Sequence, residues 1–317
     1  MEYINSALVT LGVIFIFLGL INYLRLLKNS GNVFKIIKGS HKKKKTLIVF
    51  AAMVSFLFLY LSHFGYLNLK KVMNNQLTLA TSLLFFMDGF FIYIIILLLK
   101  NLSSSLNSFY TQTIESLTRA VKLRDRYTGN HSEHVANLVK AIFEDLPSKL
   151  KKNLSKNDLV EAALLHDIGK IMTPSEILNK KSELSAQEYE QIKKHVSDGI
   201  YILEPFEVFH KIIPWIKYHH ERIDGQGYYR LKKNEIPLES RIIAVADTYS
   251  ALTTSRIYQR KRSHREAVEI LKEISGTQLD SGIVEILIKI ENKKMEKIFL
   301  KSGFNISQDE YYKVLAK

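Results

Sequence analysis

The first 100 residues contain three long runs of apolar side chains with few charges inside them. The runs cover residues 7–27, 46–66 and 77–99. Each is close to the ~20 residues that an α-helix needs to cross the hydrocarbon core of a bilayer. A buried helix of a soluble domain rarely extends this far without a polar face. The pattern therefore predicts a region of three transmembrane helices at residues 1–100.

Basic residues indicate how these predicted helices are oriented. The loop between the first two runs contains seven lysines, whereas the loop between the second and third runs contains two. The positive-inside rule places the lysine-rich loop in the cytoplasm, where it can contact the head groups of membrane lipid. The N-terminus is then outside, and residues 101–317 are cytoplasmic. The first run has neither a basic segment before it nor an Ala-x-Ala site after it, so we expect an uncleaved anchor.

Residues 101–123 are expected to form a connecting (signalling) helix that leaves the membrane. Its apolar residues recur at spacings close to three and four, among them Leu102, Leu106, Phe109 and Leu117. Such a stripe suits the seam of a parallel homodimer, and it equally suits packing of the helix onto its own domain. The sequence leaves both interpretations open.

The rest of the chain has the periodicity of α-helices. Apolar side chains recur at positions i, i+3 and i+4 in residues 133–143, 158–166, 186–203 and 264–274. No segment shows the regular alternation of apolar and polar residues that marks a half-buried strand. The predicted fold class is therefore all-α, with a cytoplasmic helical domain at residues 124–317.

Composition narrows the chemistry of this domain. The chain contains no cysteine, which excludes disulfides, zinc–thiolate sites, iron–sulfur clusters and cysteine nucleophiles. A bound metal would have to be held by histidine, aspartate and glutamate. A net charge of +14 can indicate nucleic-acid binding, but residues 1–100 contain 11 Lys and Arg residues and only two acidic ones. Because the excess charge lies beside the membrane segments, we expect no direct binding of DNA or RNA.

Histidine and aspartate residues recur through the helical domain. The candidate metal ligands are His131, His166, Asp167, His195, His219, His220 and Asp247. Nitrogen and oxygen donors without thiolates suit Fe, Mn, Zn or Ni. Seven ligands exceed what one tetrahedral ion uses, which favours two divalent metal ions of the kind that support in-line attack at phosphorus. Taken singly, each residue also has ordinary structural uses at helix ends.

One motif combines two of these ligands with a cation. His166 and Asp167 end an apolar helix at residues 159–165, so both side chains can point into one cleft. Lys170 follows Asp167 by about one helical turn, and its ammonium group can lie near the same cleft. The motif therefore predicts a cation beside two metal ligands.

The residues around these positions form longer strings whose order and spacing are specific. The strings include Arg-Asp-Arg-Tyr-Thr-Gly-Asn-His-Ser at 124–132, Ala-Ala-Leu-Leu-His-Asp-Ile-Gly-Lys at 162–170, His-His-Glu-Arg-Ile-Asp-Gly-Gln-Gly-Tyr at 219–228 and Ile-Pro-Leu-Glu-Ser-Arg-Ile-Ile-Ala-Val-Ala-Asp-Thr-Tyr at 236–249. From about residue 124 to residue 290 the chain resembles the HD-GYP subfamily of HD-domain phosphohydrolases. The resemblance implies an all-α fold and a centre of two or three metals. It also implies hydrolysis of the bacterial messenger cyclic di-GMP to linear pGpG or GMP by a metal-bridging hydroxide, at the inner membrane of a bacterium.

The resemblance also implies roles for individual residues. The seven candidate ligands would hold the metals, with Asp167 bridging the ions. Lys170 would contact the scissile phosphate, so Asp167 and Lys170 are the expected catalytic residues. The expected substrate contacts are Lys170, Gly225, Gly227, Tyr228 and Arg256. Some family members have a further glutamate ligand where this chain has Tyr127, which favours two ions over three.

Three positions depart from the family pattern. Tyr229 replaces the proline of Gly-Tyr-Pro, Ser250 replaces an aspartate, and Gln259 replaces a basic residue. In the family these positions help to hold the dinucleotide, and Gln259 cannot offer a phosphate a charge-assisted hydrogen bond. Two alternatives to cyclic di-GMP hydrolysis therefore stay open. The chain is a phosphohydrolase of another cyclic or linear nucleotide, or a catalytically weak membrane-bound receptor or scaffold.

Four other residues have ordinary structural interpretations. His134 follows His131 by three residues and is expected beside the site or on the surface, without binding metal. His210 and His264 lie outside the motif strings and are expected to be structural. Trp215 lies in an apolar turn before the histidine pair, and we expect it in the core and not under a base.

Overall fold

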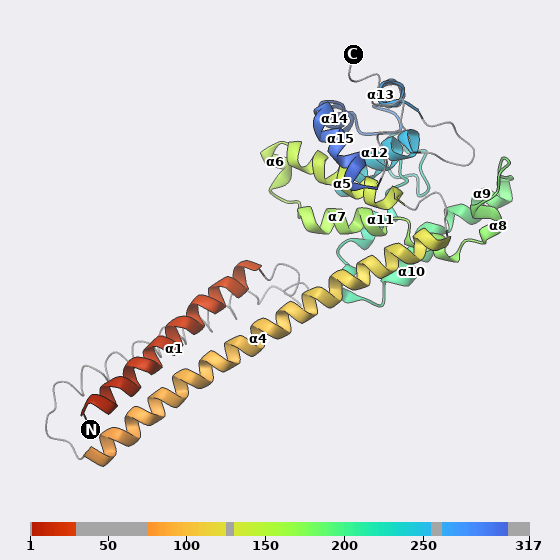
Figure 1. The fold of residues 1–317 in the computed structure, drawn as a ribbon. Helices are drawn as coiled ribbons and strands as arrows, with labels where there is room; N and C mark the ends of the chain where they lie inside the picture. Colours follow the sequence, from red (N-terminus) through yellow and green to blue (C-terminus); the bar gives the residue numbers. More distant parts are fainter. Residues whose placement is uncertain (1, 30–74, 125–129, 255–261, 304–317) are drawn as a thin grey trace. The chain divides into compact units, whose positions relative to one another are not determined.

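The structure is a computed structural model, and it describes residues 2–29, 75–124, 130–254 and 262–303 (Figure 1). The second predicted span, at residues 46–66, lies outside the described residues. The same holds for three residues named above for their place in the family pattern, namely Tyr127, Arg256 and Gln259.

The chain divides into two compact units, residues 1–112 and 113–317. In the first unit, helix α1 (Glu2–Asn29) packs along helix α4 (Asn75–Arg124). The ring of Phe15 lies 5.9 Å from the ring of Phe86 and 5.4 Å from that of Phe90, measured between centroids. Edge-to-face contacts of this kind add to the apolar packing between the two helices.

Within the described residues, one helix is long and apolar enough to cross a membrane, and it covers Leu79–Arg124. A shorter apolar helix covers Ala7–Tyr23. The structure thus supports a membrane-spanning segment in α4 on length and composition alone. The predicted total of three spans stays a prediction.

The second unit is built from short helices, and its described residues contain no β-strand. After the end of α4 come α5 (His131–Asp145), α6 (Ser148–Lys151), α7 (Lys156–Leu165), the 3₁₀ helix η1 (Ile168–Met172), α8 (Ser175–Leu178), α9 (Ala186–Lys193), α10 (His195–Leu203), the 3₁₀ helix η2 (Glu207–Phe209), α11 (Ile213–Lys217), α12 (Leu238–Thr253), α13 (His264–Glu273), α14 (Ser281–Ile288) and α15 (Asn292–Lys301). The prediction of an all-α domain is confirmed for the described residues.

Helix α5 lies at the centre of this domain, in contact with α7, α12, α14 and α15. Its apolar face, which includes Leu138, Val139 and Ile142, is completely buried. Burial of each such side chain stabilises the fold by about 1.5–3 kcal/mol. Trp215 is also buried, as its apolar surroundings in the sequence predict. The core therefore fixes the ends of α5, α7 and α12 relative to one another.

The last turn of α4 is bonded to the domain that follows it. Arg124 donates a hydrogen bond to the carbonyl oxygen of Thr173 at 3.2 Å, and the Asn179 amide donates to the carbonyl of Arg124 at 3.3 Å. Lys122 donates to the side-chain oxygen of Asn130, the residue before α5, at 2.7 Å. Ile114 and Val121 are buried earlier in this helix, and the hydrogen bonds of Lys122 and Arg124 join its end to its own domain.

Gly169 allows η1 and α10, which lie beside the candidate metal ligands, to approach each other closely. A Cβ atom at this position would lie 1.9 Å from the carbonyl oxygen of His195 and 2.4 Å from the backbone nitrogen of Gly199. Both are backbone atoms, so no side chain can move aside. Helix η1 therefore contacts α10 at a distance that only glycine permits.

We predict that Gly169→Ala destabilises the domain by about 1–3 kcal/mol or more, because the new methyl group overpacks the contact between η1 and α10. Gly282→Ala is the matched control, since its Cβ would meet its nearest neighbour, Asp280 Oδ1, at an ordinary 3.4 Å. The fluorescence of Trp215, which is the chain's single tryptophan, follows urea unfolding of either variant. Equal stability of Gly169→Ala and the wild type would contradict the prediction.

Candidate metal centre

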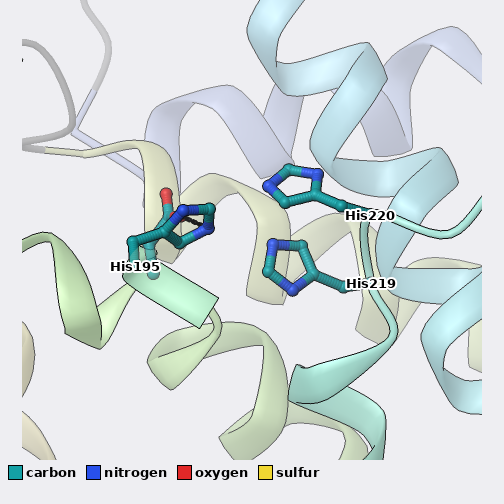
Figure 2. A group of neighbouring side chains, drawn as sticks. His195, His219 and His220 are labelled. Atoms are coloured by element: carbon teal, nitrogen blue, oxygen red, sulfur yellow. Dashed lines mark ion pairs between the residues drawn. The ribbon is translucent and has the colours of Figure 1, made fainter. Parts of the chain in front are cut away.

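The structure brings all seven predicted metal ligands together, although they come from five separate segments. They occupy the first residue of α5 (His131), the end of α7 (His166 and Asp167), the first residue of α10 (His195), the segment after α11 (His219 and His220) and the third turn of α12 (Asp247). Figure 2 shows His195, His219 and His220 turned toward one another. The sequence predicted these residues as one site, and the structure places them as one cluster.

Three overlapping groups within this cluster have ligand atoms that all lie within 4.8 Å of one another. The groups are Asp167 with His195, His219 and His220; Asp167 with His131 and His166; and Asp247 with His166 and His219. Asp167 belongs to two of them. Its Oδ1 lies 3.4 Å from Nε2 of His195, while its Oδ2 lies 3.3 Å from Nε2 of His166. One carboxylate thus faces histidines on two sides.

Three of the imidazoles are held by the same backbone contact. Nδ1 of His166, His195 and His219 lies 2.6–2.7 Å from the carbonyl oxygen three residues earlier in the chain. A carbonyl oxygen only accepts, so each Nδ1 carries the proton and donates it. In the neutral form of each ring, Nε2 is then the bare nitrogen, and it is directed into the cluster.

These three Nε2 atoms are buried, and within the described part of the chain none of them makes a hydrogen bond. A buried polar atom without a partner costs about 1–3 kcal/mol, so three of them in one place call for a ligand. Bare imidazole nitrogens beside two carboxylates form the donor set that Fe, Mn, Zn or Ni accepts. The residues present therefore fit a divalent metal centre.

Burial keeps most of these imidazoles neutral. Desolvation lowers the pKa of His131, His195 and His219 below the usual histidine value. It also lowers the pKa of His220, to about 3. A neutral imidazole is the form that binds a metal ion. These four side chains are consequently ready to act as ligands at neutral pH.

The two aspartates of the cluster are kept in their charged form. Burial alone would raise the pKa of Asp167, but the charges of His166 and Lys170 hold this pKa well below its usual range. Burial is likewise outweighed at Asp247, where His131 lowers the pKa of the carboxyl group. The pKa of His166 is raised, because Asp167 more than offsets the effect of burial. Both aspartates are therefore ionised, as metal ligands must be.

Lys170 lies where its spacing in the sequence predicts. Its ammonium nitrogen is 2.6 Å from Asp167 Oδ2, and the side chain is 15% exposed. The cation is thus next to the cluster and still reaches solvent.

The loop that contains Gly225, Gly227 and Tyr228 borders the cluster. The ring of Tyr228 lies 4.8 Å from the ring of His220. Gly225 has φ +82°, and a Cβ at Gly227 would lie 2.6 Å from backbone atoms of Glu221 and Arg222. Both glycines are therefore required by the backbone. The structure places Tyr228 beside the cluster, and contact of the three residues with substrate stays a prediction.

Glu221 holds this loop, which the sequence analysis did not foresee. Its buried carboxylate accepts hydrogen bonds from the backbone N–H groups of Tyr229 at 2.6 Å and Leu231 at 2.7 Å. These bonds fix the backbone around Tyr229 without the proline that the family pattern has there. The available signal was an acidic residue directly after the histidine pair, and it gave no indication of an interaction eight and ten residues away.

Ser250 does not lie where a dinucleotide could contact it, so the expectation that this position helps to hold the substrate was wrong. Its side chain is completely buried, and its hydroxyl oxygen lies 2.8 Å from Nδ1 of His131 and 2.9 Å from Nδ1 of His134. His134 is completely buried too, so it lies behind the site and not on the surface. His210 bonds to a backbone carbonyl and His264 to Tyr249, in keeping with structural roles.

Comparison with known proteins decides the family. A profile of the HD domain family matches residues 115–283, which is more than half of the chain. The chain belongs to the HD domain family. The predicted family is thereby confirmed, and the HD domain accounts for the cluster, since the match contains all seven candidate ligands.

Several HD domain relatives have established names. The chain is 35% identical over 175 residues to a 3'3'-cGAMP-specific phosphodiesterase of Vibrio cholerae, a match of 55% of this chain and 40% of that protein. It is 34% identical over 188 residues to a cyclic di-GMP phosphodiesterase of Thermotoga maritima, a match of 58% and 50% respectively. The chain thus spans half or less of the length of these relatives. Among solved structures, an HDG"Y"P protein from Bdellovibrio bacteriovorus aligns with 50% of this chain and 51% of that one, at 22% identity and a TM-score of 0.42.

We predict that His219→Ala lowers the affinity of the HD domain for Mn²⁺ by at least about tenfold, because it removes one of the bare buried nitrogens. The measurement is the metal-to-protein ratio of the full chain in detergent across a Mn²⁺ titration. His210→Ala is the control, because His210 is exposed and its ring bonds to a backbone carbonyl. A His219→Ala protein that takes up Mn²⁺ like the wild type would refute this assignment.

Proposed function

We propose that the chain is a membrane-anchored, metal-dependent phosphodiesterase that hydrolyses cyclic di-GMP to linear pGpG or GMP. The observation that carries this proposal is the cluster of three buried Nε2 atoms, none of which makes a hydrogen bond among the described residues, beside two ionised aspartates. Two divalent ions in such a site activate water and neutralise the charge that develops on a phosphodiester. The names of the relatives support a cyclic dinucleotide as the substrate.

The protein's own residues would contribute orientation and charge. The backbone carbonyls behind His166, His195 and His219 keep each Nε2 directed inward, so no reorganisation accompanies metal uptake. The two oxygens of Asp167 face different histidines, which suits a carboxylate shared by two ions. Both contributions are fixed before substrate arrives.

Lys170 is the group we assign to the substrate phosphate. Its ammonium nitrogen lies next to Asp167 and keeps partial contact with solvent. From there it can donate a charge-assisted hydrogen bond to a phosphate oxygen as negative charge accumulates. Asp167 and Lys170 are accordingly the proposed catalytic residues. Gly225, Gly227, Tyr228 and Arg256 are the further proposed substrate contacts.

A second substrate is favoured by a specific observation. The Vibrio cholerae relative is named for 3'3'-cGAMP, and it matches this chain at about the same identity as the cyclic di-GMP enzyme does. The backbone at Tyr229 is held by Glu221 and not by proline. The loop that borders the cluster therefore need not share the family's usual preference for cyclic di-GMP. We therefore propose 3'3'-cGAMP as the alternative substrate.

The expected outcome of an assay is Mn²⁺-dependent hydrolysis of cyclic di-GMP or 3'3'-cGAMP by the full chain in detergent. Asp167→Asn abolishes turnover, and Lys170→Met lowers kcat by about 10²–10³-fold, as loss of a charge-stabilising donor does. Lys289→Met is the matched control, because that lysine directly follows α14 and its side chain is 78% exposed. A chelator such as EDTA stops the reaction of the wild type.

Two results would count against the proposal. Absence of turnover with every cyclic dinucleotide under reducing conditions would remove the enzymatic function. An unchanged cellular phenotype for Asp167→Asn would favour the receptor or scaffold interpretation instead.

We further propose that three spans anchor the chain in the bacterial inner membrane, with the N-terminus outside and the HD domain in the cytoplasm. The apolar helix Leu79–Arg124 and the seven lysines between the first two apolar runs support this topology. A parallel homodimer along α4 is compatible with the exposed side chains of Leu102 and Phe109.

Because the chain contains no cysteine, single cysteines can report its topology directly. We expect an impermeant maleimide to label Asn68→Cys in intact cells, since the second predicted loop is outside. It should label Ser40→Cys and Lys289→Cys only after the membrane is permeabilised. Labelling of Ser40→Cys in intact cells would overturn the proposed orientation.

A further inference from the structure

His131 is held differently from the other buried imidazoles of the cluster. Nδ1 of His166, His195 and His219 donates to a carbonyl oxygen, which can only accept. Nδ1 of His131 instead meets the hydroxyl oxygen of Ser250 at 2.8 Å. A hydroxyl group can donate or accept. The neighbour of His131 therefore does not by itself decide which ring nitrogen carries the proton.

A second imidazole shares the same hydroxyl group. Nδ1 of His134 lies 2.9 Å from Ser250 Oγ, and the three side chains are buried, with exposed fractions of 3% for His131 and 0% for the other two. The hydroxyl has one proton, so it can donate to one of these nitrogens and must accept from the other. With neutral rings, one Nδ1 is protonated and the other is not. The tautomers of His131 and His134 are thereby coupled through Ser250.

The other nitrogen of His131 faces the metal site. Its Nε2 lies 2.9 Å from Asp247 Oδ1, and an ionised carboxylate oxygen accepts a hydrogen bond. When Nε2 carries the proton, Nδ1 accepts from Ser250 and the hydroxyl accepts from His134. When Nε2 is bare, Nδ1 donates to Ser250 and the hydroxyl donates to His134. Both arrangements contain the same number of protons, so the change between them leaves the buried charge unaltered.

We propose that Ser250 and His134 are positioning residues that set the tautomer of His131 and reverse it when a divalent cation binds. The inference rests on the metal site of the proposed function. In the metal-free chain the Nε2 proton of His131 bonds to Asp247. On cation binding, His131 gives up its Nε2 proton and its Nδ1 receives the proton of Ser250, while Ser250 receives the Nδ1 proton of His134. The proton lost at His131 Nε2 is balanced by the one that His134 gains at its own Nε2, so the three side chains hold three protons before and after.

Removal of the hydroxyl breaks this coupling. In Ser250→Ala, Nδ1 of His131 loses its partner in a site that solvent does not reach, which disfavours the tautomer with a bare Nε2. Loss of a partner behind a metal-binding histidine typically weakens metal affinity by about 10–100-fold. Ser250→Thr keeps a hydroxyl group at the same place and is expected to restore most of that affinity.

The test measures Zn²⁺ binding to the full chain in detergent by competition with a chromogenic chelator. Ser240→Ala is the matched control: Ser240 is a completely buried serine of the same helix α12, and its hydroxyl donates to the carbonyl of Trp215 at 2.9 Å. We expect Ser250→Ala to weaken binding of one ion by about 10–100-fold and Ser240→Ala to leave binding unchanged. If Ser250 had a purely structural role, Ser250→Ala and Ser240→Ala would both lower the stability of the domain, and neither would change the affinity for Zn²⁺.

A second readout follows the tautomer itself. Histidine-selective ¹⁵N NMR distinguishes a protonated from a bare ring nitrogen, and Zn²⁺ is diamagnetic. Zn²⁺ should move the proton of His131 from Nε2 to Nδ1 in the wild type, with the opposite change in His134. In Ser250→Ala the resonances of His134 should not respond. This measurement needs no substrate and no turnover.

The outcomes separate this inference from the metal site on which it rests. Equal Zn²⁺ affinity of Ser250→Ala and wild type, or His134 resonances that ignore Zn²⁺ in the wild type, overturns the coupling and leaves the metal site standing. Failure of the wild type to bind Zn²⁺ overturns both. Weaker binding in Ser250→Ala, with recovery in Ser250→Thr, establishes the role of the hydroxyl group.

Discussion

Burying a group of imidazoles and carboxylates away from water is the constraint on which the rest of this domain depends. Each imidazole needs a hydrogen bond on one nitrogen if the other is to stay bare. The chain supplies that bond from the last turns of helices, where carbonyl groups lack their usual intrahelical partner. Ala163 near the end of α7, Ile192 near the end of α9 and Ile216 near the end of α11 provide these carbonyls. Three short helices therefore end where the cluster requires an acceptor.

Close approach of the backbone completes this arrangement. Asp167 can meet His195 because Gly169 lets η1 lie directly on α10. The loop after the histidine pair is held in a related way, since Gly227 leaves room for the backbone of Glu221 while the Glu221 carboxylate binds two N–H groups of the loop. Glycines of the motif strings thus allow separate segments to approach closely, and the geometry of the cluster depends on these close approaches.

The helical class could be predicted from local periodicity, and the gathering of the seven candidate ligands from the motif strings that carry the family resemblance. Helical periodicity identified an all-α domain, and an apolar helix ending in His166-Asp167 indicated where two ligands would meet. The match to the HD domain family covers the same part of the chain, residues 115–283. The roles of Ser250, His134 and Glu221 could not be predicted in this way. Ser250 lies 119 residues from His131 in the chain, and only packing of α12 against α5 brings the two together. The number of membrane spans depends on residues 46–66, which lie outside the described residues.

The end of α4 is likewise held by hydrogen bonds to the ends of other helices. Arg124 donates to the carbonyl of Thr173, three residues after Lys170, while Lys122 donates to Asn130, which directly precedes His131. The carbonyl of Asn130 in turn accepts from the backbone N–H of His134 in the first turn of α5. One helical turn is thus hydrogen-bonded both to the residue that follows η1 and to the residue that precedes His131.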